Sequence, residues 1–262
     1  MFKNNKMKSI LLLMLAFVMV FSIAACGGSD ESAEGDGIPT YIAVTEPTFP
    51  PFDTTDEDGN IVGFDMDLLN AIAEDQGFKV EYLSMGFDAL IPALQAKNAD
   101  IIAAGMNAED PERQAKVDFS TTYYDSALVV VVKEDSTTIN SIDDLTPDMK
   151  VASQIATTGG DKVTELAESG AIAEAVILDA FTTCMLQLQN GDVSAVIIDK
   201  PVAEAYINKQ PGTVKAVGEP MGAESYGFAV QKGNQELLDK INAGLQNMID
   251  NGTYDALVEK WF

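Results

Sequence analysis

Residues 63–78 read GFDMDLLNAIAEDQGF, and this stretch indicates how the chain around it folds. Two aspartates stand near its start and Gly77 follows its last turn. Acidic residues near the first turn and a glycine just past the last one are the start and stop signals of an α-helix. Short apolar runs at 41–44 and 79–83 flank the stretch and are typical of β-strands. The sequence therefore predicts a strand–helix–strand unit over 41–83.

The same alternation continues along the chain. Residues 87–100 predict a helix, with Pro92 in its first turn or at a kink, and residues 101–104 a further strand. The very apolar run at 127–132 opens a second series. Its predicted elements are a capped turn at 141–145, strands at 150–153, 176–178, 195–198 and 214–217, an apolar run at 226–230, and helices at 161–168, 181–189, from Pro201, 234–250 and 255–262. Strands that alternate with helices predict an α/β fold with parallel sheets.

The length of the chain favours two lobes. About 225 residues follow residue 38, which is long for one core and comfortable for two lobes of about 100 residues each. Ligands of open α/β sheets bind beyond the carboxyl ends of the strands. We therefore expect a cleft between the lobes, lined by residues that follow strands.

Charge and composition exclude several classes of function. The formal net charge of −25 disfavours nucleic-acid binding, which needs clustered Lys and Arg. The chain has no histidine, so histidine-based triads and imidazole metal sites are excluded. Cys184 falls in a predicted helix, where a buried apolar role is more common than a catalytic one. We expect no cofactor and no metal.

The first residues predict export. Positively charged residues precede an apolar stretch at 10–21, and the segment ends in IAAC, with Cys26 last. This pattern is that of a secretory signal peptide, and it resembles the lipobox of bacterial lipoproteins, in which the cysteine is lipidated. The alternatives are an ordinary signal peptide or one N-terminal membrane span. Residues 27–37, GGSDESAEGDG, predict a flexible tether.

Long motifs in a fixed order resemble the polar amino-acid-binding proteins of ABC uptake systems. They are EPTFPPFDTTDEDGNIVGFDMDLLNAIA, FDALIPALQAKNADII, PERQAKVDFSTTYYDS, IATTGG, AVIIDKP and NGTYDALVEKWF. The resemblance covers essentially all of residues 38–262. It implies a two-lobed, type II periplasmic-binding-protein fold with a hinge. The implied boundaries are 1–26 for the lipoprotein signal peptide, 27–37 for the tether, 38–124 plus 226–262 for lobe 1, 125–225 for lobe 2, and crossings near 123–127 and 223–227.

The resemblance assigns three residues to the two ends of an amino acid. Arg113 matches the arginine that grips the α-carboxylate, and a planar guanidinium suits that task. Thr157 matches a loop that offers its hydroxyl and backbone N–H groups to the same carboxylate. Asp199 matches the aspartate that accepts the α-ammonium. The alternatives are a solvated arginine, a plain turn before a helix and a helix cap, respectively.

Further matches concern the ligand side chain. Phe49 and Phe87 match aromatic residues that sandwich it, although either could be core, and core is the better assignment for Phe52 and Phe64. Glu46 matches an acidic position near its far end, with a solvated loop carboxylate as the alternative.

The loop from Gly105 to Arg113 also belongs to the implied site, but it departs from the family spacing. Its sequence GMNAEDPER is one residue longer than usual. Either Asn107 or Ala108 could therefore take the position of the family's Ser or Thr.

Charge counting bears on specificity. A zwitterion held by Arg113 and Asp199 is balanced, so Glu46 would add a desolvated negative charge unless the ligand side chain is cationic or offers amide donors. This favours Arg, Lys or Gln as the ligand.

The implied function is capture without chemistry. The protein, expected to be a monomer anchored by lipid on Cys26, would close on a free amino acid outside the cell membrane. It would then deliver this amino acid to an ABC permease. Two alternatives share the architecture: an exported cyclohexadienyl or arogenate-type dehydratase, and a sensor module that presents its ligand to a receptor.

Overall fold

The computed structural model describes residues 37–262, of which residues 39–262 form one unit. The predicted export segment with Cys26 lies outside the described residues, as does the tether before Gly37. None of the helices described is both long and apolar enough to cross a membrane.

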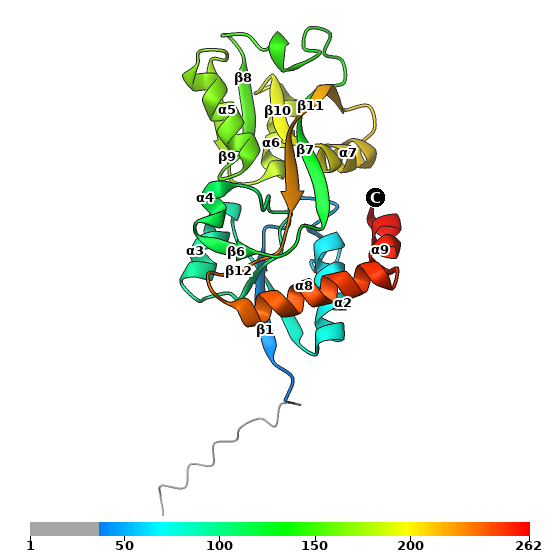
Figure 1. Ribbon diagram of the computed structural model, residues 1–262. Helices are drawn as coiled ribbons and strands as arrows, with labels where there is room; N and C mark the ends of the chain where they lie inside the picture. Colours follow the sequence, from blue (N-terminus) through cyan, green and yellow to red (C-terminus); the bar gives the residue numbers. More distant parts are fainter. Residues whose placement is uncertain (1–36) are drawn as a thin grey trace, which may run out of the picture. The chain divides into compact units, whose positions relative to one another are not determined.

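The first sheet, in the lower half of the ribbon in Figure 1, combines parallel and antiparallel strands. From edge to edge it runs β4 (Lys79–Ser84), β1 (Thr40–Thr45), β5 (Ile101–Ile102), β12 (Ala229–Gln231) and β6 (Val117–Phe119). β1 pairs in parallel with β4 and β5, whereas β12 is antiparallel to both β5 and β6. The helices of this part are α2 (Phe64–Gln76), α3 (Phe87–Gln95), α4 (Pro111–Gln114), α8 (Gln235–Asp250) and α9 (Thr253–Trp261).

Both faces of this sheet are buried. Successive side chains of its strands point to opposite faces, and each face lies in an apolar cluster. Ala43 and Ile101 belong to the apolar cluster that includes α2 and α8, and α2 packs against α8. Val44 and Ile102, one residue further along each strand, belong to the cluster under α3. As predicted, α2 ends at Gly77, whose positive φ of 70° suits glycine.

The second sheet has the order β11 (Val214–Tyr226), β7 (Tyr124–Lys133), β10 (Ala195–Asp199), β8 (Lys150–Gln154) and β9 (Glu174–Leu178). β8 is parallel to β9 and β10, and β7 is antiparallel to β10 and β11. The 3₁₀ turn η1 (Ile142–Asp144) and the helices α5 (Thr158–Glu168), α6 (Phe181–Asn190) and α7 (Lys200–Lys209) belong to this part.

The continuous apolar run in β7 is explained by the two covered faces of this sheet. Val129 and Val131 belong to the cluster that contains residues of α6 and α7, whereas Val130 and Val132 belong to the cluster that contains Val163 of α5. A strand that is buried on both sides needs apolar residues at every position.

The chain passes between the two sheets twice. It leaves β6 and enters β7 through residues 120–123, and it returns from β11 to β12 through residues 227–228. The two crossing strands lie side by side, with Tyr124 paired to Tyr226. These connections lie next to the predicted crossings near 123–127 and 223–227, and the assignment of residues to two lobes stays a prediction.

The predicted fold class, α/β with sheets flanked by helices, is confirmed. The expectation of parallel sheets is wrong in part, because β7 and β12 begin after the crossings and run against their neighbours. Pro92 lies in the second turn of α3, beyond the predicted first turn, so the carbonyl of Asp88 lacks its helical donor. Helix α4, strand β6 and the hairpin of β2 (Thr54–Thr55) with β3 (Ile61–Val62) were not predicted.

Candidate functional site

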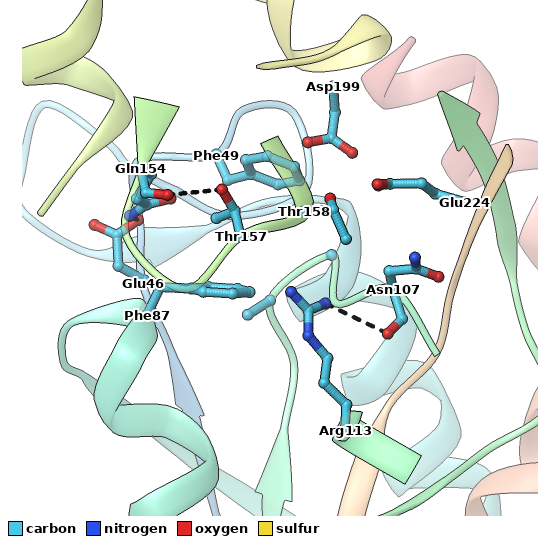
Figure 2. A pocket seen from close by; sticks show the side chains of 12 residues that line it. Glu46, Phe49, Phe87, Asn107, Arg113, Gln154, Thr157, Thr158, Asp199 and Glu224 are labelled. Atoms are coloured by element: carbon cyan, nitrogen blue, oxygen red, sulfur yellow. Dashed lines mark hydrogen bonds between the residues drawn. The ribbon is translucent and has the colours of Figure 1, made fainter. Parts of the chain in front are cut away.

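One pocket lies where strand ends of the two sheets meet (Figure 2). It contains all eight residues that the sequence assigned to ligand binding. The space between them, with the open solvent at its mouth included, is about 330 Å³. The lining residues are Glu46, Phe49, Phe87, Ala104, Gly105, Asn107, Arg113, Gln154, Thr157, Thr158, Asp199 and Glu224.

Arg113 is held by contacts from both sides of the pocket. The Asp110 carboxylate caps α4 by accepting from the backbone N–H of Arg113 at 3.1 Å, and it also lies 3.6 Å from the guanidinium Nε. Nη2 donates to the carbonyl of Ala156 at 3.0 Å and Nη1 to that of Asn107 at 3.4 Å. The guanidinium lies 5.5 Å from the ring centre of Phe87. Arg113 is 7% exposed, so it is not the solvated surface arginine of the alternative interpretation.

Thr157 caps α5 with its hydroxyl. The oxygen accepts from the N–H of Gly160 at 3.0 Å and donates to the carbonyl of Gln154 at 2.7 Å. Its hydroxyl is therefore engaged within the loop, as in the alternative of a helix-capping turn. A Cβ at Gly160 would lie 2.4 Å from the carbonyl oxygen of Gln154, so the tight turn requires glycine there. The N-terminus of α5, including Thr158, faces the pocket.

Asp199 is the last residue of β10 and the N-cap position of α7, but its side chain does not cap the helix. Instead, its carboxylate accepts the hydroxyl of Tyr226. Asp199 is 4% exposed. Burial, together with the nearby carboxyl of Glu224, raises the pKa of Asp199 well above its usual value, and the Tyr226 hydrogen bond opposes this.

Glu46 follows β1 and faces residues of the second sheet. Its Oε2 accepts from Gln154 Nε2 at 2.9 Å and from Thr48 Oγ1 at 2.7 Å. Burial raises the pKa of Glu46, and these two hydrogen bonds partly offset the increase. Glu46 is therefore a buried pocket carboxylate and not the solvated loop residue of the alternative.

Phe49 forms an aromatic wall of the pocket and is fixed by other rings and by the backbone. Phe49 packs against Phe181 and Tyr226, with ring centres 5.7 and 6.1 Å apart. Gly105 has a φ of +51°, and a Cβ there would lie 2.6 Å from a Phe49 ring carbon. The close approach of ring and backbone thus requires glycine. Phe52 and Phe64 are fully buried, which confirms their assignment to the core.

The longer loop before Arg113 places Asn107 in the pocket and Ala108 outside its lining. Asn107 Oδ1 accepts from the backbone N–H groups of Glu109 at 3.1 Å and Ser225 at 3.3 Å. Ala108 is buried against Gly227. Of the two residues left open by the spacing, Asn107 is therefore the one that reaches the pocket.

Four lining residues were not predicted from the sequence, and two of them, Gln154 and Glu224, bring an amide and a carboxyl group to the pocket. Gln154 ends β8, directly before the predicted loop. Glu224 lies near the end of β11, just before the second crossing between the sheets, and is a charged residue two positions before the buried Tyr226. Its place in the predicted crossing was the available signal. The others are Ala104 and Thr158.

Thiol and metal chemistry find no support in the described residues. Cys184 is fully buried in α6, and burial raises the pKa of its thiol to about 12. Over residues 37–262, no group of three or more acidic or thiol side chains could hold a metal ion. The prediction that Cys184 is a small buried residue is confirmed.

Comparisons with known proteins find similar sequences and similar structures. The arginine-binding extracellular protein ArtP of Bacillus subtilis (strain 168) is 35% identical over 258 residues, which is 98% of each chain. An ancestral arginine-binding protein, solved with arginine bound, has a TM-score of 0.81 and 44% identity, covering 85% of this chain and 98% of that one. The ancestral amino acid-binding protein AncCDT-1, a precursor of cyclohexadienyl dehydratase, has a TM-score of 0.78 and 37% identity, covering 85% and 95%.

These relatives are binding proteins by name, and they confirm the resemblance seen in the sequence. The model of the family "Bacterial extracellular solute-binding proteins, family 3" matches residues 41–262. The chain therefore belongs to family 3 of the bacterial extracellular solute-binding proteins.

Proposed function

We propose that this protein captures one free amino acid in the pocket and delivers it to an ABC permease. One observation carries the proposal: Arg113 and Asp199, contributed by the two sides of the pocket, line the same small space. A guanidinium suits the α-carboxylate, and a carboxylate suits the α-ammonium.

L-Arginine is the first candidate ligand. Among the described lining residues, the ionisable side chains are the cation Arg113 and the carboxyl groups of Glu46, Asp199 and Glu224. A buried carboxylate without a cationic partner is costly, so this excess of acid favours a ligand with a positively charged side chain. Glu46 would receive the guanidinium. The names of the relatives point the same way.

Capture would work by closure of two lobes, residues 38–124 plus 226–262 and residues 125–225. Several hydrogen bonds already join these segments, among them Arg113 to Ala156, Gln154 to Glu46, and the Tyr206 hydroxyl to the carbonyl of Thr48. A ligand that contacts both lobes would shift the hinge equilibrium toward the closed form by its higher affinity for that form.

The localisation follows from the family and the export segment. Solute-binding proteins of this family are extracellular, and lipid on Cys26 would keep this one at the outer face of the cell membrane. Incorporation of a labelled fatty acid into the wild type but not into Cys26→Ala would support the anchor. Equal labelling of both would refute it.

A ligand screen tests the central proposal. Thermal unfolding with each of the twenty amino acids should show the largest rise in Tm with L-arginine, followed by lysine or glutamine, because a ligand that binds only the folded state stabilises it. Calorimetry then gives Kd. If no amino acid raises Tm or produces binding heat, the proposal is wrong.

An exported dehydratase on the same fold is the competing function. The named relatives are binding proteins, which supports capture without chemistry. Turnover of prephenate or arogenate by the purified protein would reverse this conclusion.

A further inference from the structure

Two buried carboxyl groups face one another at one end of the pocket. Glu224 on β11 is 5% exposed and Asp199 at the end of β10 is 4% exposed. Figure 2 shows their carboxyl oxygens turned toward each other. Both carboxyl groups line the same pocket, and a hydrogen bond between two carboxyl groups requires a proton on one of them.

The surroundings favour retention of that proton. Two like charges in a desolvated site repel strongly, so a buried carboxyl pair holds one proton in common. The Tyr226 hydroxyl donates to Asp199, but one neutral donor cannot compensate for two charges. Burial and the neighbouring Glu224 carboxyl raise the pKa of Asp199.

Few other ionisable groups act on the pair. Tyr226 contacts it from β11, while Arg113 of α4 and Glu46 after β1 line the same pocket. On the neighbouring strand β7, the residues paired with Asp199 and Glu224 are Leu128 and Ser126, which do not titrate. At the start of α7, Lys200 forms an ion pair with Glu204 at 3.1 Å, and both are half-exposed.

We propose that Glu224 is a second acceptor for the ligand's α-ammonium, and that the ammonium displaces a proton which Glu224 and Asp199 share in the ligand-free pocket. The inference rests on the proposed function, because it needs a ligand with an α-ammonium group. It makes Glu224 a binding residue and couples capture to proton release.

The charge balance explains why the exchange is feasible. Before binding, the pair carries one proton and a net charge of −1. On binding, the O–H bond of the protonated carboxyl breaks and leaves its electron pair on the oxygen, the proton passes to solvent, and two carboxylates accept N–H donors from the ammonium. The sum over the pair and the ammonium is again −1. One positive charge replaces another, so the desolvated site gains no net charge.

Two consequences follow. Protons compete with the ligand, so affinity should rise with pH, by up to tenfold per pH unit while one full proton is released. A ligand without the α-amino group cannot replace the proton. Such an analogue should bind weakly and release none.

Calorimetry tests the exchange directly. L-Arginine is titrated into the full chain between pH 6 and 8 in buffers of different ionisation enthalpy. The dependence of the observed heat on the buffer gives the number of protons released, which we expect to approach one. With Glu224→Gln this number should fall close to zero while arginine still binds. The analogue 5-guanidinopentanoic acid should release none from the wild type.

Control variants distinguish proton release by the Glu224–Asp199 pair from release by other acidic residues. Glu219→Gln changes an exposed glutamate on the same strand and should leave proton release unchanged. Glu46→Gln should retain it, although arginine binds more weakly. Buffer-independent heats in the wild type, or undiminished release in Glu224→Gln, would overturn the proposal.

A ligand-free measurement distinguishes this inference from the proposed function. The infrared carbonyl band of a protonated carboxyl should be present near pH 7 in the wild type, smaller in Glu224→Gln, and unchanged in Glu219→Gln. A band that does not respond to Glu224→Gln refutes the shared proton even if arginine binds. If the band responds but no amino acid binds, the proposed function fails and the shared proton remains.

Discussion

Replacement of Arg113 by alanine should abolish tight amino-acid binding without unfolding the protein. Two guanidinium nitrogens hold carbonyls, Nη2 that of Ala156 across the pocket at 3.0 Å and Nη1 that of Asn107 in its own loop at 3.4 Å. The guanidinium has five N–H donors in all, which leaves donors for a ligand carboxylate. The variant removes both the bond to Ala156 and those to the ligand.

The size of the effect follows from the number of bonds. A bidentate pair between the guanidinium and the α-carboxylate contributes two charge-assisted hydrogen bonds of about 1.5–3 kcal/mol each. The loss of about 3–6 kcal/mol corresponds to a decrease in affinity of about 10²- to 10⁴-fold. Arg113→Lys should recover only part of this, because an ammonium keeps the charge but lacks the planar pair of donors.

Calorimetry with L-arginine measures the loss, and thermal unfolding without ligand monitors the fold. The control is Lys116→Ala, which removes an exposed cation two residues beyond α4 that does not line the pocket. Its affinity should match the wild type. Wild-type affinity in Arg113→Ala, with an unchanged Tm, would refute the assignment of the carboxylate site.

Three further predictions concern the buried residues Gly105, Asp65 and Cys184. In Gly105→Ala, the new Cβ would lie 2.6 Å from a Phe49 ring carbon, so we expect about 1–3 kcal/mol lower stability and weaker arginine binding; unchanged values in denaturation and calorimetry would contradict this. Burial raises the pKa of Asp65 to about 7, so the folded wild type holds a proton that the unfolded chain releases above about pH 4. Its unfolding free energy should therefore fall, relative to Asp65→Asn, by up to about 1.4 kcal/mol per pH unit toward pH 7; urea titrations that show a constant difference would exclude it. Cys184 should resist alkylation in the native protein and react after unfolding, because its buried thiol has a pKa of about 12; rapid native labelling would contradict its burial.

Local signals predicted most elements correctly because the local chemistry alone determines them. Gly77 ends α2 in the left-handed conformation that glycine adopts without strain. Ser141 caps the turn η1 through a capping box with Asp144, which a few neighbouring residues specify. Such elements depend on short-range interactions that the sequence displays directly.

Strand direction could not be predicted from the same signals. An apolar run such as β7 shows burial on both faces but not whether its neighbours are parallel. β7 and β12 run against their partners because each begins after a crossing between the sheets. That direction is a property of the whole chain path.

Most residues that line the pocket could be predicted from the sequence, but the contacts among them could not. The resemblance identified Arg113 and Asp199, yet it gave Thr157 a free hydroxyl that the structure engages in capping α5. It also overlooked Glu224, because the alternation of strands and helices does not show which side chain of a long crossing strand points into the pocket. Spacing along the chain indicates position, whereas contacts between distant segments require the fold.

The position of Glu224 ties recognition of the ligand to the proposed hinge. β11 leads into the second crossing between the sheets and carries both Glu224 and Tyr226, which contact Asp199. Arg113 belongs to the other side of the pocket, on α4. A bend in β11 would therefore change the distance between the ammonium site and the carboxylate site. An amino acid has its two charged groups on one carbon atom, so it can satisfy both sites only at one separation, and that separation selects the closed form.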